Sequence, residues 1–229
     1  MALTDAEIQA LLLSLKISLV AVIVALPVAV AVALILARRD FPGKWLFDGL
    51  VHLPLVLPPV VMGYLLLVVF GTNAPLGAWL NDTIGLRFVF SWTGAALAAG
   101  IVTFPFQVRA VRLALEAIDP GLEQAARTLG AAPLDCLMTV TMPLALPGVI
   151  AGAITAFAAS LGQFGAIITF VSNVPGETRT LPLAIYSAIQ TPGGEAAAAR
   201  LVVLSIALAL AGLVLSEIAA RRIKAWSRQ

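Results

Sequence analysis

Long stretches of this sequence carry no charged side chain, and that limits the folds open to the chain. A helix that crosses a membrane needs about 20 consecutive apolar residues. Backbone N–H and C=O groups in hydrocarbon must be satisfied within each segment, which favours helices. The sequence therefore predicts an all-α integral membrane protein with a single membrane domain over residues 1–229. The expected spans lie in residues 17–37, 50–70, 88–108, 146–170 and 196–219.

Composition agrees with a membrane location. Hydrophobic residues make up 61% of the chain and charged residues 11%, whereas a soluble protein carries about 25% charged residues. A soluble core has no room for this much apolar surface, so lipid is expected to surround much of the chain. The single cysteine, Cys136, excludes an internal disulfide and is expected to be a small buried or cytoplasmic thiol.

Prolines and short segments modify the simple pattern. Pro54, Pro58 and Pro59 are expected to kink or break the second span. Residues 180–191 are apolar but too few to cross, so they predict a re-entrant or interfacial helix that begins near Pro182. The sequence thus predicts five spans, or six if the long N-terminal segment or this short one is divided differently.

Basic residues predict the orientation, because cytoplasmic segments of membrane proteins are enriched in Lys and Arg. With a periplasmic N-terminus and a cytoplasmic C-terminus, the outer segments keep only four of the fourteen basic residues: Lys16, Arg87, Arg179 and Arg200. The expected location is a bacterial cytoplasmic (inner) membrane, crossed several times. The net positive charge is explained by this distribution and requires no nucleic-acid partner.

A polar insert between the third and fourth spans (residues 119–143, within a loop of about 112–143) lies in the cytoplasm in this orientation. Asp119 suits a helix N-cap, Pro120 a first helical residue and Gly130 the position just after a helix. Pro133 can open a second helix that runs toward Pro143. One face of the first helix is apolar and small, and it consists of Leu122, Ala125, Ala126 and Leu129. Such a helix suits docking into a partner's groove, and it equally suits a surface helix that caps the bundle.

Small and polar residues in the fourth span are candidates for a substrate pathway. They are Ser160, Gly162, Gln163 and Gly165. Ser160 and Gln163 are three apart, which places them on one helix face near the middle of the span. Residues of these types also mediate helix packing in membranes, so both interpretations stay open.

The insert resembles the cytoplasmic EAA loop of ABC importer permeases, E-A-A-x3-G-x9-I-x-L-P. The matching residues are Gln124-Ala125-Ala126, Gly130 and Val140-Thr141-Met142-Pro143. In that family the loop forms a coupling helix that sits in a cleft of the ATPase subunit. The resemblance implies that the coupling contacts come from Leu122, Glu123, Gln124, Ala125, Ala126, Arg127, Leu129 and Gly130. Gln124 stands where the motif has Glu, and Glu123 comes one residue earlier.

Nearly the whole chain resembles the membrane permeases of molybdate ABC importers, most distinctively in HLPLVLPPVV and SNVPGETRT. The resemblance implies a homodimer, two copies of a cytoplasmic ABC ATPase that bind ATP and Mg, and a periplasmic oxyanion-binding protein that delivers molybdate or tungstate. It implies no catalytic residue, metal or cofactor on this chain. Sulfate/thiosulfate permeases share the fold. Ala159 and Gln163 stand where the family's ARSLGEFGA stretch has Arg and Glu.

Two other classes of function remain to be weighed. An ATP-independent secondary anion transporter or channel often keeps ionisable groups at mid-depth, and these spans lack them there. An intramembrane enzyme needs a catalytic pair or metal cluster at depth, which one His and one Cys do not supply. Residues 171–195 form an external loop that could receive the binding protein.

Overall fold

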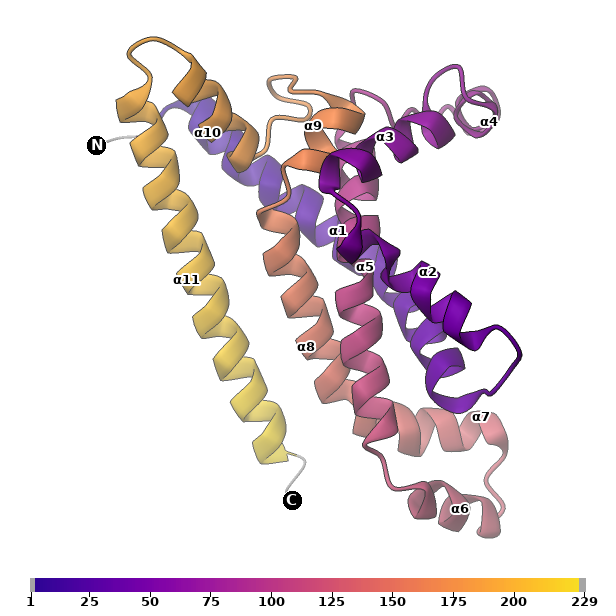
Figure 1. Cartoon of the computed structure of the whole chain (residues 1–229). Helices are drawn as coiled ribbons and strands as arrows, with labels where there is room; N and C mark the ends of the chain where they lie inside the picture. The colour runs from indigo at the N-terminus through magenta and orange to yellow at the C-terminus, as the bar shows by residue number, and fades with distance from the viewer. Residues whose placement is uncertain (1–2, 227–229) are drawn as a thin grey trace.

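The computed structural model describes residues 3–226, with side chains as far as residue 212, and this part of the chain is helical without strands. Figure 1 shows the arrangement. The elements are α1 (Asp5–Arg38), α2 (Lys44–Val56), α3 (Pro59–Phe70), α4 (Pro75–Ile84), α5 (Trp92–Glu116), α6 (Pro120–Thr128), α7 (Pro133–Cys136), the π-helical turn η1 (Leu137–Thr141), α8 (Met142–Leu161), α9 (Gly165–Val171), α10 (Leu181–Gln190) and α11 (Glu195–Trp226).

Four helices in the described residues are long and apolar enough to cross a membrane: α1, α5, the continuous α7–η1–α8 helix and α11. The helices α2 and α3 are apolar enough only when taken together, as a broken span or a re-entrant loop with a bend of 114°. Pro58 is the N-cap of α3 and Pro59 its first residue, so the break falls where the prolines predict it. The prediction of an all-α membrane protein is confirmed, and the described residues hold four spans, or the expected five if α2 and α3 together form one.

Small residues bring the central helices together. A Cβ atom added at Gly148 of α8 would lie 2.2 Å from the Ala114 side chain of α5. One added at Gly152 would lie 3.0 Å from the Ala110 side chain of the same helix. Without a hydrophobic driving force between helices in lipid, such close backbone approach is a main source of association. Thus α5 and α8 form a tightly packed centre against which α1 also lies (Figure 1).

The two ends of the molecule differ. The N-terminus lies at one end, near α10, and α11 brings the chain to the other end, where α6 projects beyond the bundle (Figure 1). The short apolar segment 180–191 forms α10, a helix of ten residues that is too short to cross, as expected. At the same end lies α4, a short helix that the sequence analysis did not predict.

The fourth span departs from the prediction at both ends. The helix that opens at Pro133 does not stop near Pro143, because it continues through η1 into α8. The span then ends at Leu161 rather than near residue 170, and Gly162 forms its C-cap. Glycine weakens a helix, and Gly165 allows α9 to start against Pro59, whose Cβ would lie 2.8 Å from a Cβ added at Gly165.

Candidate functional site

The α6 helix is bounded by the signals that the sequence predicts. At its start the Gly121 N–H donates to the Asp119 carboxylate at 2.8 Å. At its end Gly130 adopts the left-handed conformation, with φ of +91°. The Gly130 N–H donates to the Arg127 carbonyl and the Ala131 N–H to the Ala126 carbonyl, a Schellman motif. Local chemistry therefore determines where this helix begins and ends.

The apolar stripe of α6 is not packed into the bundle. No residue of α6 is buried. Leu129, just past the helix, is 89% exposed, and Ala125 is exposed as well. Leu122 lines a hollow of about 300 Å³ beneath the ends of α5 and α8, together with Ile118 and Leu144. The stripe is open at this end of the molecule, which does not fit a helix that merely caps the bundle.

The one acidic side chain of α6 turns toward the bundle. Glu123 accepts hydrogen bonds from the Arg38 guanidinium at 2.7 Å and from the Thr141 hydroxyl at 2.8 Å. Its side chain is 18% exposed. Gln124, at the motif's Glu position, is exposed instead. Glu123 is therefore not a free carboxylate at the surface that could replace the motif's Glu.

The predicted pathway residues meet at a helix break. Ser160 lies in the last turn of α8, while Gln163 lies beyond its end, so the prediction that they share a helix face is wrong. Both residues therefore lie at the end of α8 and not at the middle of the span, and this end of α8 points away from α6 (Figure 1). Both are buried, and the Ser160 Oγ and Gln163 Nε2 atoms have no hydrogen-bond partner among the described residues.

This break packs against the break in the second span. Gly165 at the start of α9 touches Pro59 at the start of α3. One turn further, Gly63 of α3 lies so close to α9 that an added Cβ would be 2.7 Å from the Ala166 carbonyl oxygen. Interrupted helices at membrane depth are tolerated where they are buried in protein or line a cavity. Two such interruptions in contact, with unpaired polar atoms beside them, are typical of transporter pathways.

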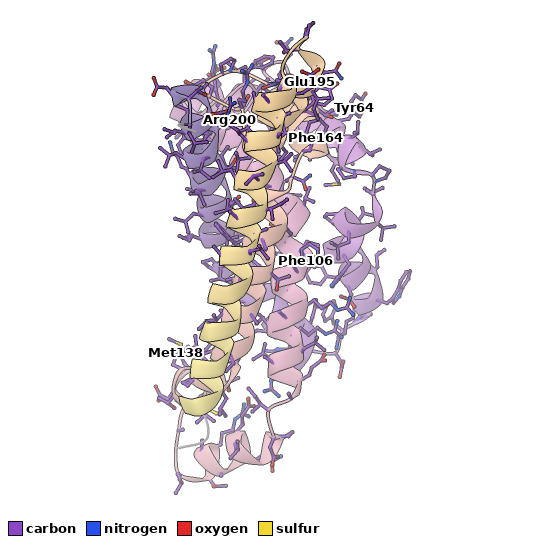
Figure 2. The ribbon with its side chains drawn as sticks, turned by 90° about the vertical axis from the view of Figure 1, so that its left-hand side faces the viewer. Tyr64, Phe106, Met138, Phe164, Glu195 and Arg200 are labelled. Atoms are coloured by element: carbon purple, nitrogen blue, oxygen red, sulfur yellow. The ribbon has the colours of Figure 1, made fainter. Side chains whose placement is uncertain are left out.

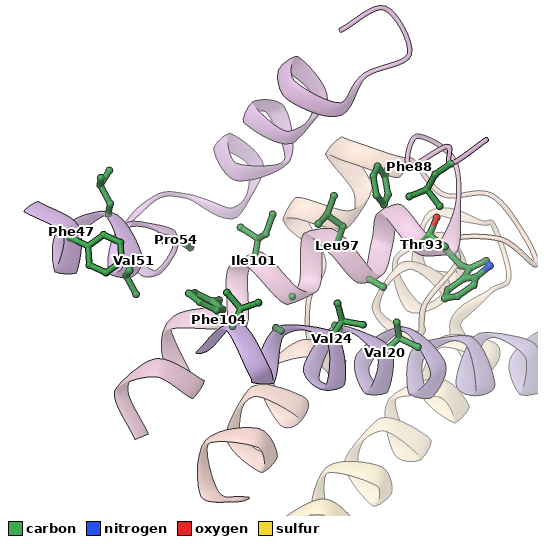
Figure 3. Close-up of a pocket in the computed structure, with 18 residues that line it drawn as sticks. Val20, Val24, Phe47, Val51, Pro54, Phe88, Thr93, Leu97, Ile101 and Phe104 are labelled. Carbon is green, nitrogen blue, oxygen red and sulfur yellow. The ribbon is translucent and has the colours of Figure 1, made fainter. Parts of the chain in front are cut away.

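A larger groove lies elsewhere and is unsuited to an anion. It measures about 730 Å³ and is lined by α1, α2 and α5 and the loop before α5 (Figure 3). Apart from Thr93 and the indole of Trp92, the side chains that line it are wholly apolar. An anion would lose its hydration there without gaining donors, which is strongly unfavourable. The groove is therefore not a candidate for the anion pathway.

An ion pair that the sequence analysis missed joins α1 and α11 near their N-terminal ends. Arg200 of α11 lies 2.8 Å from the Glu7 carboxylate of α1, whose side chain is 6% exposed. Figure 2 shows Arg200 near Glu195, at the end of the molecule opposite Met138. Thr4 and Glu7 also form a capping box at the start of α1, and the T-x-x-E pattern indicates this helix start but not the pairing with Arg200.

No group of three or more His, Cys, Asp or Glu residues within the described part of the chain is arranged to hold a metal ion. The free thiol of Cys136 is buried, with its sulfur 3.9 Å from the Glu123 carbonyl oxygen of α6.

A comparison with family models identifies the chain. The model of the binding-protein-dependent transport system inner membrane component matches residues 19–225. The chain belongs to this family. It is therefore a multi-pass membrane subunit of a transport system, not a catalytic subunit.

Relatives of this transport-system component are close in sequence. The molybdenum transport system permease protein ModB of Escherichia coli (strain K12) is 59% identical over 96% of both chains. The protein of the same name from Haemophilus influenzae is 55% identical over 95% of both chains. The sulfate transport system permease protein CysW of Synechocystis sp. is 37% identical, over 82% of this chain and 67% of that protein.

Solved structures share the fold of this family member. A chain of a bacterial alginate ABC transporter, solved with its pentasaccharide-bound periplasmic protein, matches 96% of this chain and 80% of its own length with a TM-score of 0.76. A chain of the MetNI methionine ABC transporter in an inward-facing conformation matches 96% of this chain and 99% of its own length with a TM-score of 0.73. Identities of 19% and 16% mean that these likenesses establish the fold alone.

Proposed function

We propose that this chain is the membrane-spanning subunit of an ATP-driven importer that carries molybdate across the cytoplasmic membrane by alternating access. The observation that supports this most strongly is the 59% identity to E. coli ModB over 96% of both chains. The fold of ABC importer permeases and the exposed helix α6 agree with it.

The proposal requires partners on both sides of the membrane. Two copies of this chain would form the pathway, and two copies of a cytoplasmic ABC ATPase would bind ATP and Mg. A periplasmic oxyanion-binding protein would deliver the anion to the end of the bundle that carries α9 and α10. The opposite end, with α6 and the basic residues Arg38 and Lys44, would be cytoplasmic. Basic residues at that end favour this orientation.

The α6 helix would be the contact with the ATPase. Its exposed residues include Gln124, Ala125, Arg127 and Leu129, and small side chains in the stripe permit close approach to a groove. When ATP closes the ATPase dimer, the two copies of α6 would move together and open the pathway outward. Hydrolysis would return the pathway to the inward-facing state.

Neutral donors would line the path of the anion. The Ser160 hydroxyl and the Gln163 amide can each donate a hydrogen bond to an oxyanion, and neither donor atom has a partner within the described part of the chain. Because neither carries a charge, the anion would be held weakly enough to leave. Gly162 and Gly165 have no side chains, so they add no side-chain volume at this break.

Sulfate is the second candidate substrate, since it is also a tetrahedral dianion. The similarity to CysW and the 41% identity to the chloroplastic sulfate permease 2 of Chlamydomonas reinhardtii, over 80% of this chain and 49% of that protein, give it a specific basis. The higher identity and fuller coverage of the molybdenum permeases favour molybdate.

Transport assays with the assembled complex test the proposal. The permease, its ATPase and its binding protein are reconstituted in vesicles, and uptake of labelled molybdate is measured with and without ATP. We expect ATP-dependent uptake that unlabelled molybdate or tungstate suppresses and that sulfate suppresses poorly. Stronger competition by sulfate would overturn the substrate assignment. Uptake by the permease alone, driven by an ion gradient, would overturn the ATP-driven mechanism.

A further inference from the structure

One carboxylate oxygen joins three helical elements at the α6 end of the molecule. Oε1 of Glu123, in the middle of α6, accepts from the Arg38 guanidinium at 2.7 Å and from the Thr141 hydroxyl at 2.8 Å. Arg38 is the last residue of α1, and Thr141 is the last residue of η1, immediately before α8. The chain positions of the two donors differ by about a hundred residues, so local structure does not bring them together.

The surroundings make this contact the main side-chain attachment of α6. No residue of α6 is buried, and its apolar stripe is open. Apart from the N-cap Asp119, which bonds to Gly121 next to it in the chain, the only other side-chain hydrogen bond between α6 and the rest of the described residues is the weak contact of the Cys136 thiol, 3.9 Å from the Glu123 carbonyl oxygen. Charge-assisted hydrogen bonds are about twice as strong as neutral ones. The Arg38 and Thr141 bonds are therefore the strongest side-chain hydrogen bonds between α6 and the membrane helices among the described residues.

Thr141 lies at the end of the π-helical turn η1. Thr141 is 3% exposed, and its hydroxyl also lies 3.5 Å from the Cys136 carbonyl oxygen across the π-helical turn. Single π-helical turns inside α-helices are uncommon and are often found at functional sites. Here the turn lies where the α7 segment, next to α6, becomes the membrane span.

We propose that Arg38, Glu123 and Thr141 form a joint, the α6 joint, that delivers movement of α6 to α1 and to the α8 span together. This inference rests on the proposed function, in which an ATPase moves α6. These three are positioning residues, since they touch neither the anion nor the nucleotide. Without the joint, only the two flanking loops connect α6 to the membrane spans, so α6 can move without moving them. The nucleotide-driven movement of α6 then does not reach the pathway.

The joint also gives a role to Glu123, which lies one residue before the position where the coupling motif has Glu. Because Glu123 is engaged inside the chain, the partner-facing side of α6 is left to uncharged Gln124 and to Arg127. Moving the acid one position earlier in the sequence thus exchanges an outward-facing carboxylate for an inward-facing one, since adjacent residues on a helix differ in direction by about 100°.

The test measures coupling, which a purely structural role would not change selectively. Vesicles hold the complete complex, and molybdate uptake and ATP hydrolysis are measured together. Glu123→Gln should lower uptake about tenfold while ATP hydrolysis by the assembled complex stays within about twofold. The matched control is Glu116→Gln, which removes an ion pair with Arg112 inside the single helix α5. The control should leave the ratio of uptake to hydrolysis unchanged.

Further variants keep the proposal falsifiable. The exchange Arg38→Glu with Glu123→Arg should restore much of the ratio lost in either single variant. Thr141→Val removes one hydrogen bond at nearly constant volume, so it gives the answer if Glu123→Gln fails to assemble; a drop of about threefold in the ratio is expected. An unchanged ratio in the assembled Glu123→Gln variant, or in Thr141→Val when Glu123→Gln fails to assemble, would overturn the joint. Absence of ATP-driven uptake in the unmodified complex would instead overturn the proposed function.

Discussion

The contact between α3 and α9 allows a quantitative prediction, because Gly63 leaves no room for a side chain. A Cβ atom at Gly63 would lie 2.7 Å from the Ala166 carbonyl oxygen and 2.7 Å from the Thr169 Cβ atom. Carbon atoms in contact are normally about 3.5–4.0 Å apart. Since one of the two neighbours is backbone, Gly63→Ala must push the two helices apart at the place where the broken spans meet.

The expected free-energy change combines two opposing effects. Inserting a methyl group into a packed site destabilises by about 1–3 kcal/mol. Replacing Gly by Ala inside a helix stabilises by about 1 kcal/mol. The control Gly49→Ala, in α2, has the second effect alone, because nothing lies within 4 Å of its added Cβ. The two variants should therefore differ in unfolding free energy by about 1–3 kcal/mol, the overpacking contribution.

The assay is thermal unfolding of the purified transport complex in detergent, with transport measured in parallel. For a chain of this length, 1 kcal/mol moves the midpoint by about 2–4 °C. Gly63→Ala should unfold several degrees below Gly49→Ala and should also transport more slowly, because the break is displaced. Equal midpoints and equal transport would refute the claim that α3 and α9 are packed backbone to backbone at this point.

Three further variants test individual contacts. Glu7→Gln weakens the charge-assisted bond to Arg200 and should lower the unfolding free energy by about 1–3 kcal/mol; adding Arg200→Gln should then have little further effect in a double-mutant cycle, and full additivity would argue against the pair. Asp119→Ala removes the N-cap of α6, an effect of about 1 kcal/mol, and should speed amide hydrogen exchange in α6 without changing exchange in the spans. Gly130→Ala meets no neighbour but forces a Cβ into the left-handed region, at about 1–2 kcal/mol; Gly130→Asn should recover part of that loss, and equal exchange rates in both variants would contradict this explanation.

The parts of the fold that follow from local signals were predictable. Uncharged runs identified the spans, and prolines identified the break before α3. The boundaries of α6 followed from Asp119 and Gly130, whose hydrogen bonds and backbone conformation depend only on nearby residues. Signals for α4 were also present, since Pro75 opens it and Gly85 closes it in the left-handed conformation. They were overlooked because the segment is neither long nor uniformly apolar.

The remaining features depend on contacts between distant residues. The end of α8 at Leu161 falls inside an uncharged run, and it becomes intelligible only when α9 is seen against Pro59. Glu7 and Arg200 are separated by 193 positions, and no local pattern pairs them. The pairing of Glu123 with Arg38 and Thr141 likewise joins residues that are far apart in the chain. Hydropathy and capping signals describe elements, whereas the candidate pathway and the α6 joint arise between elements.

Cross-linking at the tip of α6 tests the central claim most directly, namely that an ATPase grips this helix. Leu129 is 89% exposed, so Leu129→Cys carries an accessible thiol, while the native Cys136 is buried. Asp82→Cys on α4 is the matched control, since it is exposed and lies toward the other end of the molecule. In the complete complex, Leu129→Cys should cross-link to the ATPase subunit, and the efficiency should change when ATP binds. Cross-linking of the ATPase to Asp82→Cys alone, or labelling of Leu129→Cys by a reagent confined to the exterior, would contradict the account.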